Sequence, residues 1–309
     1  MANTKEIQNR IKSIQDTMKI TKAMYMMSSM KLRKAKQKLE NTEPYYHGLQ
    51  EQIKDIMVHF PNMEHLYFDN RSKDRMEEIK RKAFVVITGD KGMAGAYNHN
   101  VLKEAKRMVD EAESYRLLVV GEIGRHFFQS QGYEIERNFT YSATNPSMHR
   151  ARVITEHVFD LYNREEIDEV FVIGTEMINS MRADVRVEMV MPLKTRDFVA
   201  QELIDEAKED RINNDWYTIY PSPKKVLEKL AYNYVTGYMY GALVEGSASE
   251  ENSRMMAMKS ATDNAEAMLS ELSVEFNRVR QAAITQEITE VIGGAKALAN
   301  KKKKQSKVR

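Results

Sequence analysis

The residues best placed for chemistry lie in one glycine-containing turn, Gly89–Gly95, which reads Gly-Asp-Lys-Gly-Met-Ala-Gly. Such a turn between a strand and a helix can bind phosphate through its backbone amides. Its glycines, however, are spaced as in neither the dinucleotide fingerprint nor the P-loop, and no Ser or Thr follows Lys91 to hold magnesium. No acidic residue ends the next predicted strand, where a ribose would be held. The spacing therefore favours a tight strand-to-helix turn over a nucleotide site.

Other catalytic and metal-binding patterns are missing from the sequence. The seven histidines are scattered, with no H-E-x-x-H motif and no pair at ligand spacing, and no G-x-S-x-G motif occurs. The chain has no cysteine, which excludes disulfides, thiolate zinc sites and cysteine nucleophiles. We therefore expect no catalytic site, no cofactor and no metal.

The turn belongs to a middle region in which predicted strands and helices alternate. The apolar run Lys82–Thr88 has the length and flanking turns of a buried parallel strand, and the glycine turn and a helix through Val101–Val109 follow it. The next expected elements are a strand at Leu117–Val120, a helix at Glu122–Gln131, a strand at Tyr133–Phe139, a helix at Met148–Asn163, a strand at Val170–Ile173 and an edge strand at Val185–Leu193. This alternation predicts a Rossmann-like, doubly wound α/β domain at 82–195.

Both ends of the chain favour long helices, because all six prolines fall between Pro44 and Pro223. We assign helices to 1–58 and 224–300, with possible fraying or a bend at Gly293 and Gly294. Seam residues recur in steps of four and three, as in a coiled coil. They are Ile7, Ile11, Ile14, Met18, Thr21, Tyr25, Ser28, Leu32, Ala35 and Leu39 in the first helix, and Met255, Met258, Thr262, Ala265, Leu269, Leu272, Phe276, Val279 and Ala283 in the second. If the middle domain turns the chain back, the two helices pair as an antiparallel coiled coil. The remaining segments are linkers at 59–81 and 196–223 and a basic tail at 301–309.

Methionine and basic residues distinguish the first helix from a simple helical hairpin. Met24, Met26, Met27 and Met30 exceed what a two-helix seam can bury, which indicates an enclosed surface that adapts to changing partners. The basic band Lys31–Lys38 has three interpretations: a solvated face, a nucleic-acid-binding surface, or a contact with an acidic protein. No aromatic residue is interleaved in that band, so a stacking platform for single strands is missing. A nucleic-acid-binding coiled coil and a Rossmann-type enzyme remain the alternative functions.

Six segments in and next to the terminal helices form long motifs: Ile11–Met24, Lys31–Ala35, Tyr220–Pro223, Tyr240–Glu245, Arg254–Ala265 and Asn277–Glu290. Through these segments both terminal helices closely resemble those of the gamma subunit of F-type ATP synthases. It implies a non-catalytic rotor shaft that couples ion flow through the membrane ring to ATP synthesis or hydrolysis. The implied partners are the alpha and beta subunits of the catalytic ring, the epsilon subunit and the c-subunit membrane ring, with no nucleic acid and no cofactor.

Matching the motifs residue by residue implies a set of contacts between the shaft and its surrounding subunits. The implied contact residues are Lys22, Met24, Met27, Lys31, Arg33, Arg254, Arg280, Gln281, Thr285, Glu287, Ile288 and Ile292. The segment Ile288–Leu298 would form the tip, held in an apolar bearing. The glycine turn departs from the family pattern, because Lys91 replaces an arginine and Ala94 a cysteine.

The resemblance and the sequence together predict a location. The chain has neither a signal or transit peptide nor an apolar run of the roughly 18 residues that a membrane span requires. We therefore expect a peripheral subunit on the cytoplasmic face of a bacterial membrane, with no direct insertion into the bilayer. Whether protons or sodium ions drive the complex depends on the membrane ring, not on this chain.

Overall fold

The computed structural model describes residues 4–61, 63–68, 80–137, 139–179, 182–200 and 218–305, with side chains described up to residue 296. Residues 27–257 form one compact unit, and the two ends of the chain form the other. Most of the expected linker 59–81, the segment 201–217 of the second linker, and residues 306–309 of the basic tail lie outside the described residues.

Two long helices, α1 (Thr4–His59) and α6 (Pro223–Gln305), are the first and last elements of the described chain. Helix α1 runs through Pro44. Helix α6 continues through Gly293 and Gly294 to Gln305, so the helix does not fray at these glycines, and the bend stays a prediction. Gly237 and Gly241 also lie within α6, although an interior glycine lowers helix stability by roughly 1 kcal/mol.

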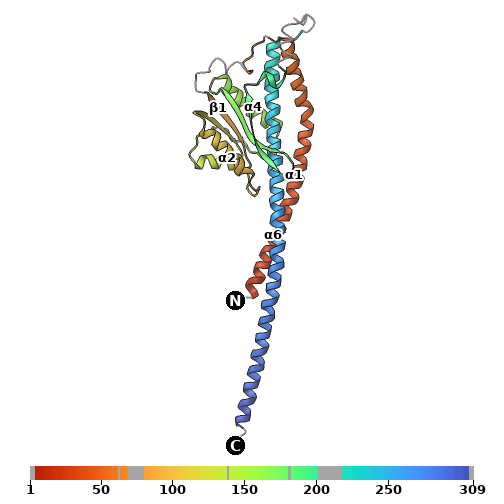
Figure 1. Cartoon of the computed structure of the whole chain (residues 1–309), viewed down its shortest axis with the longest axis vertical. Coiled ribbons are helices and arrows are strands. Elements are labelled where there is room, and N and C mark those ends of the chain that lie inside the picture. Colours follow the sequence, from red (N-terminus) through yellow and green to blue (C-terminus); the bar gives the residue numbers. More distant parts are fainter. Residues whose placement is uncertain are drawn as a thin grey trace. The chain divides into compact units, whose positions relative to one another are not determined.

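In the unit formed by the chain ends, α1 and α6 pair in antiparallel directions. The hydroxyls of Thr21 and Thr262 are 2.8 Å apart, and Lys22 forms an ion pair with Glu266 one turn away. The predicted seam positions in this unit are buried or partly buried as far as Val279, with the exception of Tyr25, which is 37% exposed. The seam ends there because α1 begins at Thr4, and α6 continues past that point (Figure 1). The last predicted seam residue, Ala283, is therefore exposed.

The unit of residues 27–257 contains a four-stranded mixed sheet in the order β2-β1-β3-β4. The strands are β1 (Arg81–Ile87), β2 (Ser114–Val120), β3 (Glu169–Met177) and β4 (Ala183–Met191). Strand β1 pairs in parallel with β2 and β3, whereas β4 pairs antiparallel with β3 and forms an edge. The alternation at Val185–Leu193 thus correctly predicted an edge strand, displaced by two residues.

Alternate residues of β1 pack into two separate cores on opposite faces of the sheet. Phe84 and Val86 face helices α2 (Tyr97–Asp110) and α3 (Glu122–Ser130). Ala83, Val85 and Ile87 face helix α4 (Met148–Asn163) and parts of α1 and α6 (Figure 1). Every side chain from Ala83 to Val86 is fully buried, which explains why this strand reads as a continuous apolar run.

One predicted strand is wrong. Described residues of Tyr133–Phe139 do not form a strand, and only Tyr141 makes an isolated bridge, to Val120. The backbone amide of Glu136 donates to Leu117, and the ring of Tyr133 packs edge-on against Phe128. Tyr133 and Ile135 alternate with polar residues because they pack against the core beside α3 and β2, and this alternation resembles that of a strand. A short 3₁₀ helix, Thr195–Asp197, follows β4.

Candidate functional site

The glycine turn is held by contacts within the chain. The Asp90 carboxylate accepts hydrogen bonds from the Ser142 and Thr144 hydroxyls and from the backbone amides of Ala143, Thr144 and Glu122. Partial burial alone would raise the pKa of Asp90, but these hydrogen bonds outweigh it and hold the pKa below its usual value. An acidic side chain at this position disfavours an anionic ligand, which agrees with the sequence interpretation of a tight turn.

Arg254 connects α6 to the same turn. Its guanidinium forms ion pairs with Glu250 and, at 3.1 Å, with Glu251, and donates to the carbonyls of Lys91 and Gly92 at 3.3 to 3.4 Å. The residue is only 7% exposed. These donors bind groups of the chain itself, and the contact of Arg254 with another subunit stays a prediction. Burial raises the pKa of Glu250, although Arg254 partly opposes this effect.

Glu251 links the same cluster to α1. Its carboxylate accepts from Lys31 at 3.0 Å and from Ser28, in addition to Arg254. Burial alone would raise the pKa of Glu251, but the hydrogen bonds from Ser28 and Lys31 and the charge of Arg254 hold it below its usual value. Lys31 thus forms an ion pair within the chain, although its side chain is 58% exposed.

The other N-terminal residues from the predicted set lie on the surface of α1. Lys22 pairs with Glu266 at 2.8 Å, and both side chains are about half exposed. Met24 is partly buried, Met27 is 50% exposed, and Arg33 is exposed. Neighbouring Met26 is 66% exposed. Exposure of large apolar side chains at this density is unusual for a surface that only water contacts.

The C-terminal residues of the set lie where α6 has no partner helix among the described residues. All described side chains of residues 280–296 are exposed, including those of Arg280, Gln281, Thr285 and Glu287. Helix periodicity places the large apolar side chains of this segment on one face. Their exposed fractions are 44% for Ile284, 54% for Ile288, 72% for Val291 and 50% for Ile292.

Sequence reasoning missed the acidic residues that organise the turn. Asp90 lies in the glycine turn, and Glu250 and Glu251 stand four and three residues before Arg254, which is the spacing of ion pairs in a helix. The sequence does not indicate that these glutamates lie beside the turn, and Ser28, a seam position too small to fill a coiled-coil layer, is the further signal. Among the described residues no cluster of three or more potential metal ligands occurs, and no helix is long and apolar enough to cross a membrane.

Comparison with known sequences extends over almost the whole chain. The family model described as ATP synthase matches residues 3–298. A protein of Ruminiclostridium cellulolyticum named ATP synthase gamma chain is 43% identical over 298 residues, which cover 96% of this chain and 99% of the relative. A protein of Acetobacterium woodii named ATP synthase gamma chain, sodium ion specific, is 35% identical over 304 residues, with 96% and 99% covered.

Solved structures share the fold at lower identity. A chain from the central stalk and c-ring of Tetrahymena thermophila mitochondrial ATP synthase superposes with a TM-score of 0.58 at 22% identity, covering 78% of this chain and 99% of that one. A chain from the OSCP, F1 and c-ring part of the Euglena gracilis enzyme gives 0.51 at 14% identity, with 89% and 95% covered. The paired terminal helices and the mixed α/β sheet thus form a fold that this chain shares with these two chains.

Sequence identity over nearly the full length makes the assignment specific. The chain belongs to the gamma-chain family of F-type ATP synthases. Its role is that of the rotor shaft, a non-catalytic subunit of the ATP synthase.

Proposed function

We propose that the exposed C-terminal turns of α6 form the tip of the shaft and rotate within an apolar bearing made by the alpha and beta subunits. The observation that carries this proposal is the exposed apolar face with Ile284, Ile288, Val291 and Ile292. Each such side chain gains roughly 1.5–3 kcal/mol when it is fully buried, so a partner surface is strongly favoured. Arg280, Gln281, Thr285 and Glu287 provide the polar contacts beside this face.

The methionines of α1 form a second contact with the catalytic ring. Methionine is flexible and polarizable, and it can pack against several geometries of a surrounding surface as the shaft turns. The cations Lys22, Lys31 and Arg33 lie on the same helix and would face acidic loops of the beta subunits. These electrostatic contacts are weakened by salt, whereas the apolar contacts are not.

The α/β sheet and its helices form the end of the subunit that meets the epsilon subunit and the c-ring. Its core of three parallel strands, with helices on both faces, supports a Rossmann-like classification, and β4 adds an antiparallel edge. The seam between α1 and α6 supports an antiparallel coiled coil. The subunit lies at the cytoplasmic face of a bacterial membrane as a peripheral protein, and it binds neither nucleic acid nor a cofactor.

Transmission of torque requires stiffness in the helix pair. The seam provides it through buried Ile7, Met258 and Ala265, together with the polar contact between Thr21 and Thr262. A buried polar layer fixes the register of a coiled coil more strictly than apolar residues do. The helices would then resist sliding past each other under load.

Site-specific photo-crosslinking in the assembled complex tests these contacts. A photoreactive residue at Met27 or Ile288 should crosslink to alpha or beta subunits, and one at exposed Lys103 of α2 should not. Purification through a tag on this chain should also yield alpha, beta and epsilon subunits together with the c-ring. Equal crosslinking at Lys103 and Ile288, or recovery of the chain without alpha and beta, would contradict the proposal.

A further inference from the structure

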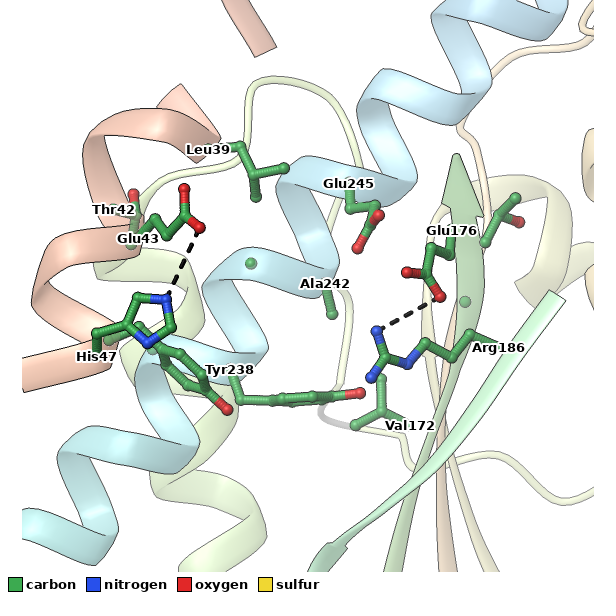
Figure 2. Close-up of a pocket in the computed structure, with 15 residues that line it drawn as sticks. Leu39, Thr42, Glu43, His47, Val172, Glu176, Arg186, Tyr238, Ala242 and Glu245 are labelled. Carbon is green, nitrogen blue, oxygen red and sulfur yellow. Dashed lines mark ion pairs between the residues drawn. The ribbon is translucent and has the colours of Figure 1, made fainter. Parts of the chain in front are cut away.

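A pocket of about 440 Å³ lies within the unit of residues 27–257, where α1, α6, β3 and β4 meet (Figure 2). Its volume falls in the range of small-molecule sites in proteins, roughly 300–1,000 Å³. None of the contacts proposed above for the shaft uses the residues that line it. The pocket therefore requires an explanation of its own.

Most of the pocket wall is apolar. Leu39 comes from α1, Val172 from β3 and Ala242 from α6. The ring of Tyr238 extends from α6 toward Val172 and Arg186 along one side, as Figure 2 shows. These groups would pack against an apolar ligand body, and the aromatic face would attract a cation.

Glycine at position 241 keeps this space open. A Cβ atom built on Gly241 would meet no heavy atom within 4 Å, whereas one on Gly237 would contact the Tyr46 ring at 3.4 Å. Both glycines line the pocket and lie inside α6, where glycine is less favourable than alanine by roughly 1 kcal/mol. A contact of 3.4 Å is an ordinary van der Waals distance, so a side chain at position 237 would lie against Tyr46, whereas one at position 241 would extend into open space.

The side chains that line the pocket include more carboxylates than cations. Glu43 pairs with His47 at 3.7 Å, and Arg186 pairs with Glu176 at 3.4 Å. Glu245 forms no ion pair with any cation in the part of the chain that the structure describes, although it is half-buried and its carboxylate points into the pocket (Figure 2). Burial and the nearby charge of Glu176 raise the pKa of Glu245, and the charge of Arg186 and a backbone hydrogen bond from Met177 only partly oppose them.

We propose that this pocket binds a small organic cation, an ammonium group carried on an apolar body. The ammonium group donates to the Glu245 carboxylate and lies near the Tyr238 ring. The apolar body packs against Leu39, Val172 and Ala242 in the space that Gly241 leaves free. Such a ligand gives Glu245 an ion-pair partner, since Arg186 pairs with Glu176 and Glu188, and it removes the apolar walls from water.

Three probes with the same ring but different charge test the proposal on the full-length chain. Phenethylammonium, phenethyl alcohol and phenylacetate are titrated at neutral pH, with binding followed by calorimetry and ligand-observed NMR. We expect the ammonium probe to bind about tenfold more tightly than the alcohol, as for one charge-assisted hydrogen bond, and the carboxylate probe to bind most weakly. The experiment needs no other subunit, so its result is independent of the proposed contacts of the shaft.

Two variants with matched controls locate the site. Glu245→Gln should remove the preference for the cation, and Gly241→Leu should abolish binding by filling the pocket, with Gly241→Ala intermediate. Their controls are Glu271→Gln and Gly48→Leu, at exposed positions of α6 and α1 outside the pocket. Circular dichroism checks that each variant is folded. If Glu245→Gln or Gly241→Leu fails to fold, the comparison of the three probes on the wild type and on Gly241→Ala tests the proposal. Equal affinity for all three probes, no binding at about 1 mM, or unchanged binding by Glu245→Gln or Gly241→Leu would overturn the proposal.

Discussion

The Thr21 hydroxyl lies 2.8 Å from the Thr262 hydroxyl, and this contact joins α1 to α6 inside the buried seam of the terminal unit. Each hydroxyl also lies within hydrogen-bonding distance of a carbonyl in its own helix, Met18 for Thr21 and Met258 for Thr262. A hydroxyl has one proton, so one threonine donates across the seam and the other donates to its own helix. The pair is therefore coupled.

This coupling predicts non-additive effects of valine substitution. Thr21→Val and Thr262→Val should each lower the free energy of unfolding by about 1 kcal/mol, because each leaves its partner with an incomplete set of hydrogen bonds. The double variant should be close to the wild type, since two valines pack well in an apolar seam. Denaturant unfolding followed by circular dichroism measures both effects. Thr17→Val is the control, because Thr17 is exposed and bonds only to Ser13 of its own helix; additive losses in the double variant would contradict the coupling.

Arg254 gives a second prediction, which separates a structural role from a role in subunit contact. Arg254→Gln should lower the free energy of unfolding of the isolated chain by about 3 kcal/mol, because it leaves Glu250 buried without its cation. Adding Glu250→Gln should recover part of the loss. Arg33→Gln, at an exposed cation of α1, should change stability by less than about 0.5 kcal/mol.

The opposite outcome is equally informative. If Arg254→Gln leaves the isolated chain as stable as the wild type but lowers ATP synthesis by the complex, Arg254 acts on another subunit. The ion pairs of Arg254 with Glu250 and Glu251 would then contribute little to the stability of the free chain.

The contrast between Thr21 and Arg254 shows what the sequence can predict. Thr21 follows from periodicity, because helix geometry alone places every third or fourth residue on one face. The sheet follows similarly from short apolar runs such as that of β1. Arg254 also lies in a helix, but its environment depends on the turn at residues 91–92, which is distant in sequence. Burial of a charge is decided by such distant partners, and a local pattern carries no record of them.

The pocket around Glu245 was unpredictable for the same reason. Leu39, Val172 and Gly241 belong to three elements with different periodicities, and each looks ordinary within its own element. Tyr133–Phe139 illustrates the converse error: apolar residues at strand-like spacing cover a helix end instead of joining the sheet.

Asp90 provides a prediction that depends on pH. Its pKa is lower in the folded chain than in the unfolded chain, where it is about 3.8, so at pH values above 3.8 Asp90 adds to the free energy of unfolding. This contribution is lost as the pH falls through the lower pKa of the folded chain. Asp90→Asn should therefore destabilise the chain by about 1 kcal/mol above pH 5, a modest figure because the carboxylate is partly solvated.

The difference between wild type and Asp90→Asn should shrink as the pH falls below about 3.8, because a protonated carboxyl resembles the amide. Urea unfolding across this range of pH measures the difference. Asp263→Asn, at an exposed position of α6, is the control. A difference that stays constant or grows in acid would show that the carboxylate charge is not what holds the turn.

Met24 tests the proposed contact of α1 with the catalytic ring. Met24→Lys should change the stability of the isolated chain by less than about 1 kcal/mol, because Met24 is only partly buried. In the complex it adds a cation to an enclosed band near other charges, so ATP synthesis should fall more than ATP hydrolysis. The matched control is Tyr220→Lys, because Tyr220 lies outside both long helices and is 91% exposed. Unchanged synthesis with Met24→Lys would exclude the enclosed contact.

Ile288 tests the proposed bearing at the end of α6. Ile288→Asp should leave the unfolding of the isolated chain unchanged within about 0.5 kcal/mol, because Ile288 is 54% exposed and α6 has no partner helix there among the described residues. In the complex the same change buries a carboxylate in the apolar bearing, which is strongly unfavourable. Assembly with alpha and beta subunits should therefore weaken, as measured by the yield of the complex on size-exclusion chromatography. Gln286→Asp adds the same charge on the other side of the helix and should have a smaller effect. If both variants assemble equally well, the apolar face of α6 is not the surface that the catalytic ring holds.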